Sequence, residues 1–181
     1  MQYDDILRQL NNYVPHTPTE AEHHSNTVAF VKRQPLCWQR TTAEGHITAS
    51  AWIIDPTHDN ALLVHHRKLD RWFQPGGHVE DDVDLFSAAR REAQEECGLT
   101  TLSPVVPAIF DIDVHAIPAN SKEQQHYHYD IRFAFYADPA APLVVSAESK
   151  DVRWFALEKL LANDTENSIR RMAAKTRGHS S

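Results

Sequence analysis

The chain has 181 residues, of which 41% are hydrophobic and 24% charged, and its formal net charge is −7 at pH 7. Its length suits one domain with additional segments, and its acidic charge argues against a broad basic surface for a nucleic acid polymer or an anionic membrane. With no apolar run of roughly 18 residues, only two cysteines and no signal-peptide pattern, the sequence predicts a cytoplasmic protein.

The first 35 residues carry two helical patterns. Apolar residues recur at helical spacing over residues 3–14, and Val14-Pro15 ends that segment. Thr17-Pro18-Thr19-Glu20 then has the residues of a capping box, with an N-cap hydroxyl, a proline at the first helical position and a glutamate at the third. We therefore expect an N-terminal helical hairpin over residues 1–35, which leans on a main domain of residues 36–181.

The rest of the chain interleaves several strand patterns with few helices. Strand patterns occupy residues 46–55, 61–66, 105–115, 126–136, 143–145 and 151–156. A glycine turn and a polar loop precede a helix over residues 84–97, which Gly98 ends. A last helix is expected from Leu157 towards Lys175. This arrangement predicts an α/β/α or α+β layered domain.

Three carboxylates project from one face of the helix expected over residues 84–97. Glu92, Glu95 and Glu96 stand at positions i, i+3 and i+4. Like charges at this spacing cost an isolated helix roughly 0.2–0.5 kcal/mol per pair unless a cation or an arginine neutralises them. Carboxylates are also the ligands that hold Mg²⁺ together with substrate phosphates. Spacing alone leaves two interpretations open, a cation site and a solvated acidic face.

The residues around these carboxylates resemble the box of the Nudix hydrolase family, G-x5-E-x7-R-E-U-x-E-E-x-G-U, where U is aliphatic. The matching residues, in the order of the box, are Gly77, Arg91, Glu92, Ala93, Glu95, Glu96, Gly98 and Leu99. One position departs, because Val83 stands where the box has its first glutamate. In the family that glutamate braces the helix through the arginine, so we expect that Asp84 serves instead or that the loop geometry is altered.

The resemblance covers about residues 45–165 and implies a fold, a reaction and a cofactor. The implied fold is an α/β/α sandwich around a mixed sheet. The implied reaction is hydrolysis of a nucleoside diphosphate linked to another group, with Mg²⁺ or Mn²⁺ held by Glu92, Glu95 and Glu96. Arg91 would steady these glutamates by ion pairing. The general base would be a box glutamate or a glutamate on a later loop, for which Glu148 is the candidate.

Residues 109–115 and 126–136 alternate between apolar and polar side chains, so an antiparallel pair would present one lattice of His, Asp and Arg. In a functional interpretation this lattice is a substrate wall that includes His128, with Arg132 on a phosphate or a base edge. In a structural interpretation it is a solvent face with ion pairs. A third hypothesis is a transition-metal site formed by His126, His128 and another histidine, because H-x-H places two imidazoles on one strand face.

Three further substrate contacts are expected at the start of the box. Gly76 and Gly77 allow a sharp backbone turn near the phosphates, and His78 follows them in the box loop. The partner implied by the resemblance is a nucleotide-like small-molecule diphosphate, and its identity stays open, as does a homodimer. The alternative to hydrolysis is a non-catalytic Nudix domain that binds a nucleotide, and Val83 is its only support.

Overall fold

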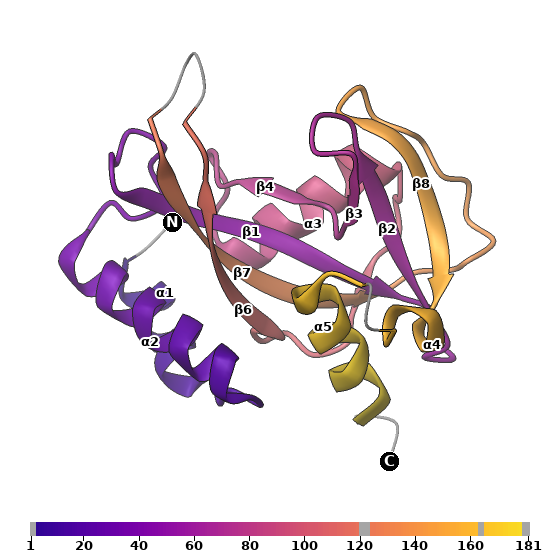
Figure 1. Cartoon of the computed structure of the whole chain (residues 1–181), viewed down its shortest axis with the longest axis horizontal. Coiled ribbons are helices and arrows are strands. Elements are labelled where there is room, and N and C mark those ends of the chain that lie inside the picture. The colour runs from indigo at the N-terminus through magenta and orange to yellow at the C-terminus, as the bar shows by residue number, and fades with distance from the viewer. Residues whose placement is uncertain (1–2, 120–123, 163–164, 179–181) are drawn as a thin grey trace.

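An eight-stranded mixed sheet forms the centre of the computed structural model, which describes residues 3–119, 124–162 and 165–178 (Figure 1). The strands are β1 (Gly45–Ile54), β2 (Asn60–His66), β3 (Arg71–Phe73), β4 (Gly76–His78), β5 (Ser103–Pro104), β6 (Asp111–Ile117), β7 (His126–Tyr136) and β8 (Ser149–Ala156). The helices are α1 (Tyr3–Asn12), α2 (Pro18–Arg33), α3 (Leu85–Cys97), α4 (Leu157–Leu160) and α5 (Asn167–Gly178). The strand order is β3-β2-β1-β7-β5, with β4 beside β1, β6 beside β7 and β8 beside β2.

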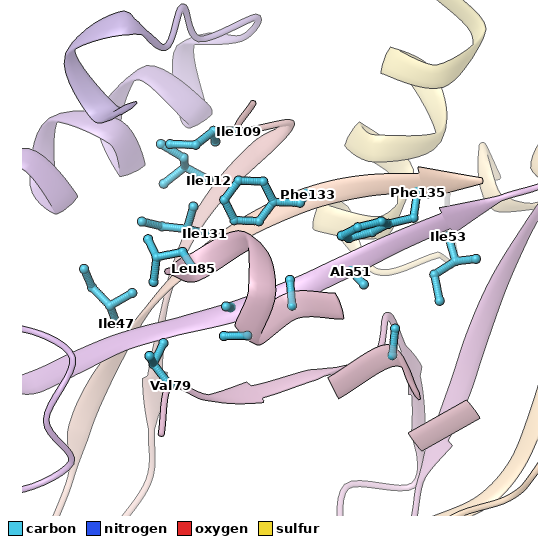
Figure 2. Close-up of a cluster of buried hydrophobic side chains, with 14 of the residues drawn as sticks. Ile47, Ala51, Ile53, Val79, Leu85, Ile109, Ile112, Ile131, Phe133 and Phe135 are labelled. Carbon is cyan, nitrogen blue, oxygen red and sulfur yellow. The ribbon is translucent and has the colours of Figure 1, made fainter. Parts of the chain in front are cut away.

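The long parallel pair β1 and β7 divides the core into two halves. Their register runs from Gly45↔Tyr127 to Ile54↔Tyr136, so alternate side chains of both strands point to opposite faces of the sheet. On one face, Ile47, Ala51 and Ile53 of β1 lie beside α3 (Figure 2). The small residues Ala88, Ala89 and Ala93 on the buried side of α3 allow this helix to approach the sheet closely.

The second face of the sheet is covered by α4 and α5. Trp52 and Ile54 of β1 pack there with Ile169 and Met172 of α5. The Trp52 indole nitrogen donates a hydrogen bond to Thr176 Oγ1 at 2.9 Å. Figure 1 shows α5 in front of the sheet and α3 behind it. Helices on both sides of a mixed sheet confirm the predicted α/β/α class.

The N-terminal helical hairpin is confirmed, and it belongs to the main core. Its apolar residues Ile6, Leu10, Phe30 and Val31 are fully buried in the same cluster as β1 and α3. The Phe30 ring stacks on Tyr129 of β7, with 4.0 Å between ring centroids. Thus α1 and α2 cover the part of the sheet around β6 and β7 that α3 leaves open, as Figure 1 also shows.

Three of the predicted elements differ from the structure. The last helix is two helices, α4 and α5, and the amide of Thr165 donates to the Ala162 carbonyl between them. Residues 143–145 form no strand, because the Val144 amide bonds the Cys97 carbonyl and so covers the end of α3. The pattern over residues 105–115 becomes a strand only from Asp111 onward. Within the described part of the chain, no helix is long and apolar enough to cross a membrane.

Candidate functional site

The two caps of α3 and its buried alanine side fix the helix so that its carboxylate face points towards β4. Asp84 caps the first turn, with its carboxylate accepting a hydrogen bond from the Ser87 amide at 2.7 Å. Gly98 ends the helix in the left-handed conformation, with φ = 73°. Because the alanine side of α3 faces β1, Glu92 and Glu96 lie against the neighbouring strand β4.

Both glycines of β4 lie in close contact with neighbouring residues. A Cβ atom on Gly77 would lie 2.7 Å from Glu92 Oε1, and a Cβ atom on Gly76 would lie 2.6 Å from the Cβ of Ser50. The amide of Gly76 donates a hydrogen bond to Glu96 Oε1 at 2.8 Å. The structure thus brings the predicted residues Gly76, Gly77, Glu92 and Glu96 into one place.

Arg91 joins the helix to the loop that precedes it. Its Nε and Nη2 atoms bind the carboxylate of Asp82, at 3.2 and 2.9 Å. Its Nη1 atom donates to Glu92 at 2.9 Å and to Glu95 at 3.2 Å. Its Nη2 atom also donates to the carbonyl oxygen of His78, at 3.0 Å. The guanidinium therefore holds the loop and two of the three carboxylates in a fixed arrangement.

Asp82, and not Asp84, takes the place of the missing box glutamate. Val83 is 74% exposed, whereas Asp84 caps α3. The expectation that Asp84 would serve is therefore wrong. The sequence contained a signal that favours Asp82. An aspartate three residues before Ser87 is a strong N-cap, so Asp84 is used at the helix end and Asp82 is the flanking carboxylate that can bind Arg91.

Asparagine substitutions distinguish these two aspartates. Asp82→Asn should lower the free energy of unfolding by about 1–3 kcal/mol, because it removes a half-buried charged partner of Arg91. Asp84→Asn should leave stability nearly unchanged, because asparagine caps helices as well as aspartate does. Urea denaturation of both variants measures the difference. An equal loss in both variants would contradict the assignment of the bracing role to Asp82 alone.

Burial and mutual repulsion raise the proton affinity of the glutamates. Burial raises the pKa of Glu96 to about 7, against the opposing effect of the Gly76 amide, and the charges of Glu92 and Glu148 add to the rise. Burial also raises the pKa of Glu92, although Arg91 opposes it. Glu148, the predicted loop glutamate, lies on the exposed turn before β8, and its charge contributes to the rise in the pKa of Glu96.

The ionised Glu96 should destabilise the metal-free protein at alkaline pH. Because its folded-state pKa of about 7 lies above the ordinary 4.5, stability falls as pH rises through this interval. Glu96→Gln cannot ionise, so we expect it to raise the free energy of unfolding by about 1–3 kcal/mol at pH 8 and to have little effect at pH 5. Urea denaturation in EDTA tests this, with the exposed Glu158→Gln as control. A gain that does not depend on pH would contradict the assignment.

The α3 carboxylates fit a hard divalent cation by their chemistry. Glu92, Glu95 and Glu96 offer only oxygen ligands, the preference of Mg²⁺ and Mn²⁺. Burial has raised the pKa of Glu92 and Glu96, and a bound cation would favour their ionised forms. Arg91 and the Gly76 amide hold these carboxylates in place.

The predicted polar side chains of β6 and β7 do share one face of the sheet, but α5 covers the end of this face that contains Arg132. Asp111 pairs with Arg132 in the strand register, and Arg132 is only 2% exposed. Its guanidinium binds Asp130 at 2.7 Å, Asp111 at 3.1 Å and Asp113 at 3.5 Å. Arg171 of α5 binds Asp111 as well, at 2.7 Å. The expected substrate contact of Arg132 is thus replaced by a buried ion-pair network, and the expected solvent face is also absent at this point.

Histidines gather at the other end of the same sheet face. The ring of His128 lies 4.8–5.6 Å, between centroids, from the rings of His46, His78, His115 and His126. Burial lowers the pKa of His128 to about 2, and its histidine neighbours lower it further. The predicted residues His78 and His128 therefore lie together. The predicted metal pair of His126 and His128 is not the closest set, because the ligand atoms within 4.8 Å of one another belong to His46, His78 and His128.

Comparisons with known proteins agree with this geometry. The family model described as NUDIX domain matches residues 45–175. No curated protein matches the sequence. Among solved structures, the MutT protein of Methanosarcina mazei Go1 is 23% identical with a TM-score of 0.57, over 77% of this chain and 97% of that one.

Two other solved structures share the fold. The Ap4A hydrolase of C. elegans, as a binary complex, is 19% identical with a TM-score of 0.52, over 74% of this chain and 96% of that one. The dihydroneopterin triphosphate pyrophosphohydrolase of E. coli is 17% identical with a TM-score of 0.52, over 71% and 92% of the two chains. Since the family model spans most of the chain and the box residues assemble against β4, the protein belongs to the Nudix hydrolase family.

Proposed function

We propose that the protein hydrolyses a diphosphate linkage in a nucleoside diphosphate joined to another group, with Mg²⁺ or Mn²⁺ as the cofactor. The observation that carries this proposal is the assembly of the α3 glutamates, Arg91 and the two glycines of β4. Solved neighbours named for the hydrolysis of Ap4A and of dihydroneopterin triphosphate support a phosphate-rich substrate. We also propose that residues 36–181 are the catalytic domain, against which the N-terminal hairpin packs.

Each box residue has a separate part in the proposed reaction. Glu92, Glu95 and Glu96 would hold the divalent cation, which when bound neutralises charge on the diphosphate oxygens. Arg91 orients Glu92 and Glu95 through its Nη1 atom. Gly76 and Gly77 let β4 approach Ser50 and Glu92 closely, because a Cβ atom at either position would overlap them, and both glycines would contact the phosphates through their backbone.

The proton of the attacking water requires a general base, and we assign Glu148 to this task. Its carboxylate is on an exposed turn, close enough to Glu96 for its charge to raise the Glu96 pKa. The Glu148 carbonyl accepts a hydrogen bond from the Arg67 amide at 2.9 Å, which anchors the turn to the end of β2. This contact holds the backbone of Glu148, while its exposed side chain is accessible to the water that it would deprotonate.

A substrate panel tests the proposal. Nucleoside diphosphate sugars, dinucleoside polyphosphates, nucleoside triphosphates and small diphosphates are incubated with the protein in Mg²⁺, in Mn²⁺ and in EDTA, and the products are quantified. We expect cleavage of at least one class in the presence of a cation and none in EDTA. Binding without cleavage of any compound would favour a non-catalytic domain, although Val83 no longer supports that alternative because Asp82 binds Arg91.

A further inference from the structure

Four strands bring histidines to one face of the sheet, at the end that α5 does not cover. His46 of β1 lies opposite His128 of β7 in the parallel register. His78 of β4 lies opposite Thr48 of β1. Thr48 is two residues after His46 on the same strand, so His46 and His78 lie on the same face of the sheet. His115 of β6 lies opposite His128 on its other side. The strand pairing itself thus places these side chains next to each other.

Three of these histidines have the spacing of metal ligands. One ring nitrogen from each of His46, His78 and His128 lies within 4.8 Å of the other two. Ligands of a tetrahedral Zn²⁺ ion, bound at about 2.0–2.1 Å, are about 3.3 Å apart, so small rotations of the rings would complete the set. The Nε2 atom of His128 is buried and makes no hydrogen bond within the described residues.

We propose that His46, His78 and His128 bind one transition-metal ion of the Zn²⁺ class, at a site separate from the α3 carboxylates. Imidazole nitrogens suit Zn²⁺ and similar ions, whereas Mg²⁺ prefers oxygen ligands, and no carboxylate belongs to this set. His46 is 2% exposed, while His78 and His128 are half-buried, so the site is closed on one side and accessible on the other. Three protein ligands leave a fourth position for water or another small ligand.

Neighbouring groups orient the rings around this site. His126 Nδ1 is within hydrogen-bonding distance of the Gln124 carbonyl at 2.9 Å, and the His126 ring stacks 5.1 Å from His46. His115 Nδ1 lies 3.2 Å from Asp113, and its ring contacts His128. These contacts hold the His126 and His115 rings, which pack against the rings of His46 and His128. His78 also connects the two sites, because its carbonyl oxygen accepts a hydrogen bond from Arg91.

The test is metal binding by the full chain after treatment with a chelator. We expect one equivalent of Zn²⁺ per chain by competition with a chromophoric chelator, and visible absorption bands of four- or five-coordinate Co²⁺. His78→Gln and His128→Gln should each weaken Zn²⁺ binding by at least about 100-fold, since even loss of a supporting contact costs 10–100-fold. His65→Gln, on β2 and outside the cluster, should bind Zn²⁺ like the wild type.

A fourth variant separates this site from the proposed hydrolytic site. Glu95→Gln should retain Zn²⁺ binding in full, whereas the proposed function requires it to impair the Mg²⁺-dependent reaction. X-ray absorption of the Zn²⁺-loaded wild type gives a readout that does not depend on the folding of variants, and we expect imidazole nitrogens in the first shell. Zn²⁺ held by oxygen ligands only, or binding that both histidine variants retain, would overturn the proposal.

Discussion

Replacing both Glu95 and Glu96 by glutamine should lower kcat/KM for the best diphosphate substrate by at least about 10³-fold. Glu96 accepts a hydrogen bond from the Gly76 amide of β4 and Glu95 forms an ion pair with Arg91, and glutamine keeps their size while removing their charge. A divalent cation would then lack two of its three proposed ligands, so the negative charge on the diphosphate would no longer be neutralised. Steady-state kinetics at saturating Mg²⁺ measure the loss.

The control variant removes the same number of negative charges from exposed positions outside the site. Glu22 on α2 and Glu158 on α4 are exposed, and a variant with glutamine at both positions should retain wild-type kinetics. Circular dichroism should show both double variants folded, because Glu96→Gln is expected to stabilise the metal-free protein. Activity of the Glu95→Gln, Glu96→Gln variant equal to that of the wild type would refute the assignment of the carboxylates.

Arg132→Met should lower the free energy of unfolding by about 3–5 kcal/mol, the largest stability effect that we expect. The guanidinium is enclosed by Asp111, Asp113 and Asp130. Methionine fills much of the same volume but leaves these carboxylates with one positive partner fewer, in a place that water does not reach. Urea denaturation at neutral pH measures the change.

A surface arginine provides the matched control. Arg153 of β8 forms an ion pair with Asp151 while its side chain is 65% exposed, so Arg153→Met should cost less than about 1 kcal/mol. At temperatures where Arg132→Met remains folded, its KM should equal that of the wild type. If Arg132→Met had the unfolding midpoint of the wild type and a KM raised more than tenfold, the result would instead support a direct contact of Arg132 with the substrate.

The parts of the fold that local sequence specifies could be predicted. Asp84 and Gly98 bound α3 as expected, because N-caps and left-handed C-caps are local features. The face shared by Glu92 and Glu96 follows from helix geometry alone. The pairing of β6 with β7 follows from the alternation of apolar and polar residues in both strands. The Nudix box contains these local signals together with the glutamates and the arginine of the site, so the resemblance predicted both.

What could not be predicted depends on contacts between distant segments. Glu20 has the position of a local capping residue, yet it is fully buried and forms an ion pair with Lys175 of α5. Arg132 is covered because α5 crosses its end of the sheet, which alternation within a strand cannot indicate. His46 lies beside His128 only because β1 and β7 run parallel, and no local pattern specifies that register.

The most direct test of the account follows the phosphorus atoms themselves. A nucleoside diphosphate linked to a second group is incubated with the protein and Mg²⁺, and ³¹P NMR monitors the anhydride resonances. The account predicts that these resonances disappear and that two phosphomonoester resonances replace them, in the wild type but not in the Glu95→Gln, Glu96→Gln variant. Unchanged anhydride resonances across the substrate panel, with nucleotides nevertheless bound, would contradict hydrolysis as the function of this protein.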